Sequence, residues 1–175
     1  NKSSIEEFLE TVYGVLKENF ENFEIILVND HSDDGSIDII KEFSSKNKGS
    51  VISIINMSIP QGVELSMNAG VDLAIGDFIF EFDSIIVDYQ PNDIIRVYKQ
   101  SLEGYDIVSF SPSSKVPFSS KVFYQIFNNF SKAKYSLQTD RFRILSRRSI
   151  NRINSINKSI MYRKVAYANS GLNVT

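Results

Sequence analysis

Short apolar runs alternate with amphipathic helical segments over the first 110 residues, and this alternation limits the chain to a few architectures. The apolar runs are rich in Ile, Val and Phe, which is typical of strands covered on both faces. The predicted strands span residues 24–28, 51–55, 78–82 and 105–110, and the predicted helices span residues 5–16, 36–43, 62–74 and 91–97. Strands that alternate with helices in this way predict an α/β domain with a mostly parallel central sheet.

Acidic loops follow two of the predicted strands. Asp30 comes directly after the first apolar run, and Asp83 comes directly after the third. In open α/β sheets, ligands bind beyond the carboxyl ends of the strands. We therefore expect the two strands to be parallel and both carboxylates to lie at the same edge of the sheet, around one polar ligand.

The pattern changes after residue 111. Residues 111–120 are loop-like, residues 121–130 carry apolar side chains at helical spacing, and an arginine-rich segment surrounds residues 142–145 before another predicted helix. No internal repeat or linker divides the chain. The sequence therefore predicts one domain over residues 1–175, with halves at residues 1–110 and 111–175.

Composition excludes several classes of protein. Hydrophobic residues at 42% and a net charge of −2 describe a globular chain and give no argument for nucleic acid as a partner. The absence of cysteine excludes disulfides and thiolate metal sites. No apolar run approaches the roughly 20 residues of a membrane span, so we expect a cytoplasmic protein. The absence of any G-x-G argues against a dinucleotide-dependent oxidoreductase, and His31, the one histidine, occupies a turn rather than a catalytic pattern.

Three segments of the first half resemble the signatures of family 2 glycosyltransferases, in the order and spacing of that family. Residues 23–36 (FEIILVNDHSDDGS) resemble a strand followed by V-D-D-x-S-x-D-G-S/T. Residues 61–70 (QGVELSMNAG) resemble the N-x-G-x-x-x-A-R-N-x-G helix, and residues 74–83 (AIGDFIFEFD) resemble the strand that leads into the metal-binding D-x-D. The resemblance implies a GT-A fold, a Rossmann-like three-layer domain whose residues 1–110 bind a nucleotide-sugar.

The last third is similar to a narrower group within that family. Residues 139–148 (TDRFRILSRR) look like the F-R-L-x-x-R segment of polyprenyl-phosphate mannosyl- and glucosyltransferases. This likeness implies transfer of a hexose from a UDP- or GDP-sugar, with inversion, to a lipid phosphate such as a polyprenyl phosphate, or to a glycan acceptor. It also implies that residues 111–175 form the acceptor side and that the protein works at the inner face of a membrane. Exposed apolar strand edges recruit other chains, which favours a homo-oligomer.

The resemblance assigns roles to four residues. Asp30 stands where the family's carboxylate accepts a hydrogen bond from the nucleobase, and a carboxylate suits this because uracil N3 and guanine N1 are donors. Asp83, with Ser84 beside it, is expected at the ribose and the diphosphate, where Asp83 would hold Mg²⁺ or Mn²⁺. Arg143 is the candidate for a phosphate contact, because a guanidinium matches phosphate oxygens.

The sequence departs from the family pattern in three places. The family begins with an apolar strand, yet this chain starts at about the residue that follows it, so we expect a missing first strand and a piece of a longer protein. The D-x-D reads Asp83-Ser84-Ile85, with a hydrocarbon at the main metal-ligand position, and Asp88 is the nearest other carboxylate. Met67 stands where the family often has Arg. These departures leave an alternative open, a catalytically degenerate GT-A domain that binds a ligand or partner.

Overall fold

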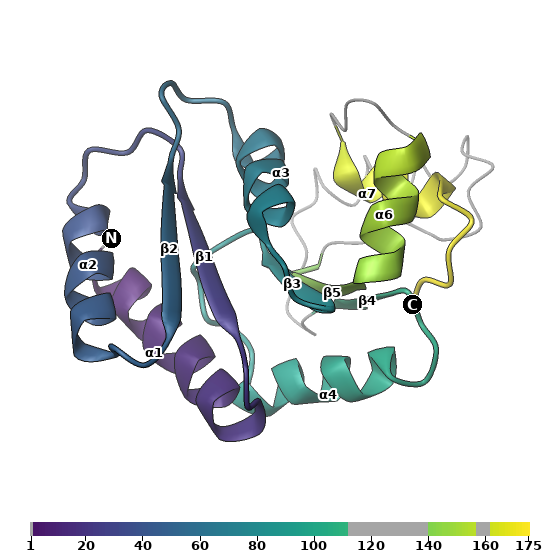
Figure 1. The fold of residues 1–175 in the computed structure, drawn as a ribbon, viewed down its shortest axis with the longest axis horizontal. Coiled ribbons are helices and arrows are strands. Elements are labelled where there is room, and N and C mark those ends of the chain that lie inside the picture. Colours follow the sequence, from purple (N-terminus) through teal and green to yellow (C-terminus); the bar gives the residue numbers. More distant parts are fainter. Residues whose placement is uncertain (1, 112–139, 157–161) are drawn as a thin grey trace. The chain divides into compact units, whose positions relative to one another are not determined.

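The computed structural model describes residues 2–111, 140–156 and 162–175, which form two compact units (Figure 1). Unit 1 comprises residues 1–76 and 83–95, and unit 2 comprises residues 77–82 and 96–175. The chain therefore passes from one unit to the other three times. The helix predicted over residues 121–130 lies outside the described residues.

Unit 1 is built on a two-stranded parallel sheet. Strand β1 (Glu24–Asn29) pairs with β2 (Val51–Asn56) in a register that aligns Glu24 with Val51 and Asn29 with Asn56 (Figure 1). Helices α1 (Lys2–Asn19), α2 (Ser36–Lys46) and α3 (Val63–Leu73) complete the unit. Parallel strands need a crossover between them, and α2 supplies it for β1 and β2.

Alternate residues of β1 face opposite helices, as a pleated strand requires. Leu27 faces the core formed by α1 and α2, where Ile5, Leu9 and Ile40 are buried. Val28 and Ile26 face α3, and they do so at Gly70. A Cβ atom at Gly70 would lie only 3.2 Å from Val28 Cγ2. The absence of a side chain at Gly70 therefore lets α3 pack closely on β1.

Unit 2 contains a three-stranded sheet in the order β3-β5-β4. Strands β3 (Phe78–Phe82) and β4 (Ile107–Phe110) are linked by α4 (Pro91–Ser101), and β5 (Phe142–Ser146) lies between them, antiparallel to both. Helices α6 (Arg147–Ile156) and α7 (Arg163–Asn169) follow β5. The core of this sheet is Phe142, Ile144 and Leu145, all of which are at most 1% exposed.

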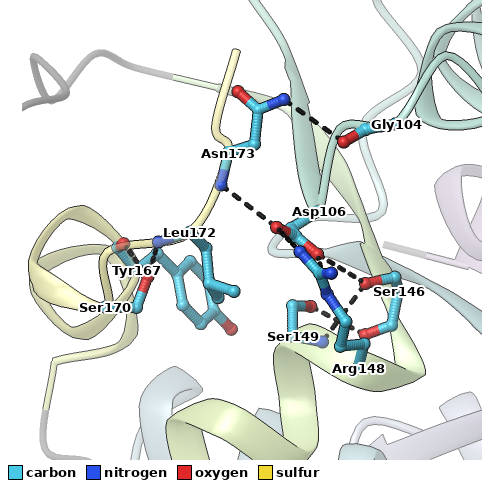
Figure 2. Close-up of polar contacts among 9 residues, drawn as sticks. All are labelled: Gly104, Asp106, Ser146, Arg148, Ser149, Tyr167, Ser170, Leu172 and Asn173. Carbon is cyan, nitrogen blue, oxygen red and sulfur yellow. Dashed lines mark hydrogen bonds and ion pairs between the residues drawn. The ribbon is translucent and has the colours of Figure 1, made fainter.

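The last residues of the chain pair with β4. Ile107 and Val174 form a parallel bridge, the backbone N–H of Asp106 donates to the Asn173 carbonyl at 2.8 Å, and that of Ser109 donates to Thr175 at the same distance. Asp106 strengthens this contact with its side chain (Figure 2). Its carboxylate accepts two hydrogen bonds from the Arg148 guanidinium, at 2.9 and 2.8 Å, and one from the Asn173 backbone at 3.1 Å.

The predicted α/β class is confirmed, and the four predicted strands begin and end within two residues of the observed ones. Ser36, the first residue of α2, does not cap the helix with its side chain. Gly35 precedes the helix in a left-handed conformation, with φ of 81°, and Ser36 instead donates from its backbone and hydroxyl to Asp34. The antiparallel β5 is a further difference from a mostly parallel sheet. It fills the position between β3 and β4, which are parallel to each other.

Strands β1 and β3 belong to different sheets, and no ladder among the described strands joins them. The parallel direction of these two strands, and the common edge for Asp30 and Asp83, therefore stay predictions. Within the described residues, no helix is both long enough and apolar enough to cross a bilayer.

Candidate functional site

Asp30 directly follows β1, and its carboxylate is held by backbone N–H groups. Its Oδ1 accepts a hydrogen bond from the Gln61 N–H and its Oδ2 accepts one from the Gly62 N–H, both at 2.7 Å. Gly62 immediately precedes α3, so the negative charge lies at the positive end of that helix. The hydrogen bond from Gln61 lowers the pKa of Asp30 most, and the bond from Gly62 lowers it further. Asp30 is therefore an oriented carboxylate that is ionised at neutral pH.

The turn after β1 is fixed by side-chain amides. Asn29 and Asn56, which are aligned at the ends of β1 and β2, form a hydrogen bond of 3.2 Å between their side chains. The Asn29 side chain also accepts a bond from the Ser32 N–H at 3.0 Å. His31 has a positive φ of 61°, a backbone conformation that residues other than glycine adopt rarely. The carboxyl edge of this sheet is thus a constrained polar turn.

The segment Asp83-Ser84-Ile85 does not present two metal ligands. Ser84 makes a local turn, in which its hydroxyl accepts a bond from the Ile86 N–H at 3.2 Å. Ile85 packs against the buried core of unit 1 that contains Ile5, Leu9 and Ile40. Position 85, the main ligand position of a D-x-D, therefore carries a partly buried apolar side chain that packs against the core.

The described residues contain no group of three or more His, Cys, Asp or Glu side chains arranged to hold a metal ion. Asp83 offers one carboxylate, and Ile85 offers no oxygen, whereas Mg²⁺ and Mn²⁺ need oxygen ligands. Asp88 is exposed and lies later in the same loop. The described residues thus do not fit the two-carboxylate site of the family pattern.

Arg143 lies in the interior of unit 2 rather than at a surface. It is aligned with Glu81 across the β3–β5 ladder and is only 1% exposed. Its Nη1 donates to Glu81 Oε2 at 2.8 Å, and its Nε donates to Asp140 Oδ2 at 2.7 Å. The candidate phosphate ligand is therefore enclosed between two carboxylates.

Helix α7 supplies further partners to the same carboxylates. The Tyr167 hydroxyl donates to Glu81 Oε1 at 2.8 Å, Arg163 Nε lies 3.5 Å from the same oxygen, and Lys164 forms an ion pair with Asp140. We call this set of residues the buried charge network: Glu81, Asp140, Arg143, Arg163, Lys164 and Tyr167. It contains three basic side chains and two acidic ones.

Burial and charge act on the network in opposite directions. Burial raises the pKa of Asp140, but the neighbouring charges of Arg143 and Lys164 outweigh it, so the pKa lies below its ordinary value. Burial, together with the Glu81 charge, raises the pKa of Tyr167 well above its ordinary value. Tyr167 therefore stays a neutral hydrogen-bond donor, while Asp140 stays ionised.

Sequence reasoning missed this network apart from Arg143. One signal was available, because Glu81 is the single charged residue within an otherwise apolar strand and a buried charge requires a partner. The partners from α7 carried no such signal. Arg163, Lys164 and Tyr167 lie in a short helix that the sequence pattern did not predict.

Comparisons with known proteins identify the family of the chain. The sequence profile of glycosyl transferase family 2 matches residues 1–167. An uncharacterized glycosyltransferase of Synechocystis sp. is 29% identical over 152 residues, which cover 83% of this chain and 47% of the relative. An undecaprenyl-phosphate 4-deoxy-4-formamido-L-arabinose transferase of Aeromonas hydrophila is 25% identical over 107 residues, covering 61% of this chain and 32% of the relative.

Among solved structures, a mannosyltransferase of Pyrobaculum calidifontis, in complex with GDP-Man and Mn²⁺, matches with a TM-score of 0.65. The two sequences are 14% identical, and the match covers 87% of this chain and 43% of that structure. The chain thus spans less than half the length of each of these three relatives.

The α/β units and the structural match show the GT-A fold that the sequence predicted. Because the profile covers residues 1–167 of the 175, the chain belongs to glycosyl transferase family 2.

Proposed function

We propose that the protein transfers a hexose from a UDP- or GDP-sugar to a polyprenyl phosphate, with inversion. The observation that carries the proposal is the carboxylate of Asp30, which is ionised, partly exposed and oriented by two backbone N–H groups within a family 2 glycosyltransferase. Each carboxylate oxygen has more than one acceptor site. Asp30 can therefore accept the imino N–H of uracil or guanine while it keeps its bonds to the backbone.

The acceptor is proposed from the F-R-L-x-x-R segment and from the relatives, several of which are undecaprenyl-phosphate transferases by name. A phosphate nucleophile is already anionic, so the reaction does not require a side chain that removes a proton. Positioning of donor and acceptor would then supply much of the rate. Asp83 and Ser84 are proposed for the donor side.

Arg143 is proposed for the phosphate of the acceptor, and the structure adds a requirement to this role. Its guanidinium is buried with Glu81 and Asp140, which would repel a phosphate. Direct contact therefore requires the buried charge network to rearrange. A substitution at Arg143 would disturb the buried charge network as well as the proposed phosphate contact. Its effect on activity could not be assigned to either role, so Arg143 is a poor first choice for mutation.

Asp30→Asn is the sharper test. An asparagine side chain accepts hydrogen bonds only through its oxygen and is uncharged. A hydrogen bond to a charged group contributes about 1.5–3 kcal/mol, so we expect nucleotide affinity to fall by roughly tenfold to a hundredfold. Calorimetric titration with UDP and GDP measures it. Asp33→Asn, in the same turn and exposed, is the matched control and should leave affinity unchanged. Equal affinity in wild type and Asp30→Asn would contradict the proposal.

A second candidate function is a GT-A domain that binds a nucleotide or a partner without catalysis. The packing of Ile85 in the core favours it, because this position cannot become a metal ligand without losing core contacts. Titration with and without Mn²⁺, followed by a transfer assay with detergent-solubilised polyprenyl phosphate, separates the two. Nucleotide binding without transfer supports the binding domain, and transfer supports the enzyme.

A further inference from the structure

Ser66 carries a buried hydroxyl that the packing of α3 does not explain. Its side chain belongs to a residue that is 7% exposed, and among the described residues its Oγ has no hydrogen-bond partner. A helical serine commonly donates to a backbone carbonyl of the preceding turn, as Ser45 of α2 does to Glu42 at 2.7 Å. A buried hydroxyl without a partner lowers stability. The family pattern that residues 61–70 resemble has alanine at this position, so the hydroxyl is a feature of this chain.

The Ser66 side chain lies on the side of α3 that faces the end of β1. Ser66 comes one turn after Gly62 and one turn before Gly70, and residues at this spacing share one side of a helix. Gly62 donates to the Asp30 carboxylate, and Gly70 packs against Val28, two residues before Asp30. The Ser66 N–H donates to the Gly62 carbonyl at 3.1 Å, which holds this turn in place. The hydroxyl therefore lies on the Asp30 side of the helix.

The Asp30 carboxylate responds to this hydroxyl. The Gln61 N–H lowers the pKa of Asp30 most, burial raises it, and the Gly62 N–H, the Ser66 hydroxyl and the charge of His31 lower it further. The hydroxyl is thus close enough to act on the carboxylate, although its orientation does not complete a hydrogen bond. Rotation about one side-chain bond, between staggered positions, can turn the hydroxyl toward Asp30.

We propose that Ser66 is a positioning residue that restricts Asp30 to one hydrogen bond with the nucleobase and so makes the donor site selective for uracil. An ionised carboxylate has about four acceptor sites. Gln61 and Gly62 occupy one site on each oxygen, and a bond from Ser66 occupies a third. The remaining site accepts one N–H. Uracil presents a single N–H, at N3, whereas guanine presents two donors side by side, at N1 and the 2-amino group. This inference rests on the proposed function and narrows the donor to a UDP-sugar.

Inosine 5′-diphosphate (IDP) allows a test in which the size of the base is constant, because IDP is GDP without the 2-amino group. Calorimetric titration of wild type and Ser66→Ala with UDP, GDP and IDP measures the affinities. In the wild type, we expect UDP to bind most tightly and GDP and IDP to bind equally. In Ser66→Ala, the vacated acceptor site can take the 2-amino group, so GDP should bind about tenfold more tightly than IDP.

Two further variants separate the hydroxyl from other effects of the substitution. Alanine is a strong helix former, so Ser66→Ala should fold with a urea midpoint no lower than that of the wild type. Ser66→Cys keeps the size of the side chain but has only a weak donor, so it should change the GDP-to-IDP ratio in the same direction. Ser45→Ala, on the exposed side of α2, is the matched control and should leave all three affinities unchanged. An unchanged GDP-to-IDP ratio in Ser66→Ala, or tighter binding of GDP than of UDP by the wild type, would overturn the proposal.

The pKa of Asp30 in the nucleotide-free protein separates this inference from the proposed function. NMR titration of the Asp30 carboxyl carbon should give a higher pKa in Ser66→Ala than in the wild type, and no change in Ser45→Ala. An unchanged pKa would show that Ser66 does not act on Asp30. Nucleotide binding with an unchanged GDP-to-IDP ratio would reject the role of Ser66 and retain the proposed function. A wild type that binds none of the three nucleotides would reject both, even if the pKa rises.

Discussion

Gly70 shows how one residue determines the packing of a helix on a strand. A Cβ atom there would lie 3.2 Å from Val28 Cγ2, closer than side chains normally pack. The nearest neighbour would have to move, and overpacking of this kind typically costs about 1–3 kcal/mol. The glycine that ends the signature in residues 61–70 thus has a physical reason within the fold.

We predict that Gly70→Ala fails to stabilise the protein, although Ala is intrinsically better than Gly within a helix by about 1 kcal/mol. Gly14 in α1 is the matched control, because a Cβ atom at that position meets nothing within 4 Å. Gly14→Ala should raise the free energy of unfolding by about 0.5–1 kcal/mol. Urea denaturation compares them, and equal stabilisation by both substitutions would show that α3 does not pack closely on β1.

Ile85 has a role in stability that the sequence pattern did not reveal. We predict that Ile85→Asp lowers the free energy of unfolding by roughly 3 kcal/mol, because it places a carboxyl group in an apolar cluster. Ile86 provides the control, since its side chain is 56% exposed. Ile86→Asp should change stability little. Similar urea midpoints for the two variants would contradict the core position of Ile85.

Ile85→Asp also tests whether nucleotide binding depends on a metal ion. A native protein with one carboxylate in this motif should bind UDP or GDP with little dependence on Mn²⁺, and Ile85→Asp should increase that dependence in the fraction that stays folded. Calorimetric titration in Mn²⁺ and in chelator measures it. Strong Mn²⁺ dependence of the native protein, unchanged by the substitution, would mean that another residue such as Asp88 supplies the second ligand.

At the scale of elements, the buried charge network connects β3, β5 and α7. Glu81 is fully buried and contacts Arg143, Arg163 and Tyr167. Removal of one charge leaves its partners uncompensated in the interior, which typically costs about 3–5 kcal/mol. The network therefore determines how firmly α7 is held to the sheet.

Glu81→Gln should lower the free energy of unfolding by about 3 kcal/mol or more. Glu42→Gln offers a direct comparison, because Glu42 forms an exposed ion pair with Lys46 at 2.8 Å. Exposed pairs contribute little, so this control should be close to wild type. Thermal and urea unfolding measure both, and hydrogen exchange of α7 should increase in Glu81→Gln alone. Unchanged exchange there would disprove the attachment of α7 through Glu81.

Asp106 joins β4, α6 and the last residues through a single carboxylate. Burial raises its pKa, but the hydrogen bonds from Arg148 and Asn173 outweigh burial and leave the pKa below the ordinary value of 3.8. A carboxyl group with a lowered pKa in the folded state stabilises the protein above that ordinary value. The contribution disappears as the pH falls through the folded-state pKa.

Asp106→Asn should therefore cost about 2 kcal/mol at pH 7, the loss of hydrogen bonds to a charged group. The difference in unfolding free energy between wild type and variant should shrink as the pH is lowered below 3.8. Urea denaturation over a series of pH values gives this difference directly. A difference that stays constant with pH would show that the ionised form of Asp106 contributes nothing.

For the whole molecule, the sequence predicted local structure better than assembly. Apolar runs and helical spacing located β1, β2, β3 and β4, because burial on both faces leaves a strong local pattern. The family signatures identified Asp30, yet only the structure shows that Gln61 and Gly62 orient it. The burial of Arg143 could not be predicted from the sequence, because its partner Glu81 lies 62 residues earlier in the chain. The second partner, Asp140, lies 3 residues earlier.

Strand β5 was not predicted, since its segment was interpreted only as arginine-rich. Its direction was also beyond sequence reasoning, because the order and direction of strands depend on contacts between distant segments. The split of the chain at residues 76, 82 and 95 has the same origin. Local signals therefore determine which elements form, and tertiary contacts determine how they pair.

The central place of β5 has a consequence for the order in which the protein folds. Strands β3 and β4 each pair with β5 and not with each other, so neither ladder can form before residues 142–146 have been synthesised. The β1–β2 pair needs only residues up to 56. Contacts between distant segments form slowly, and domains emerge from the ribosome at about 5–20 residues per second. During synthesis, the half that carries Asp30 can therefore begin to fold several seconds before the sheet that encloses Arg143 has all its strands.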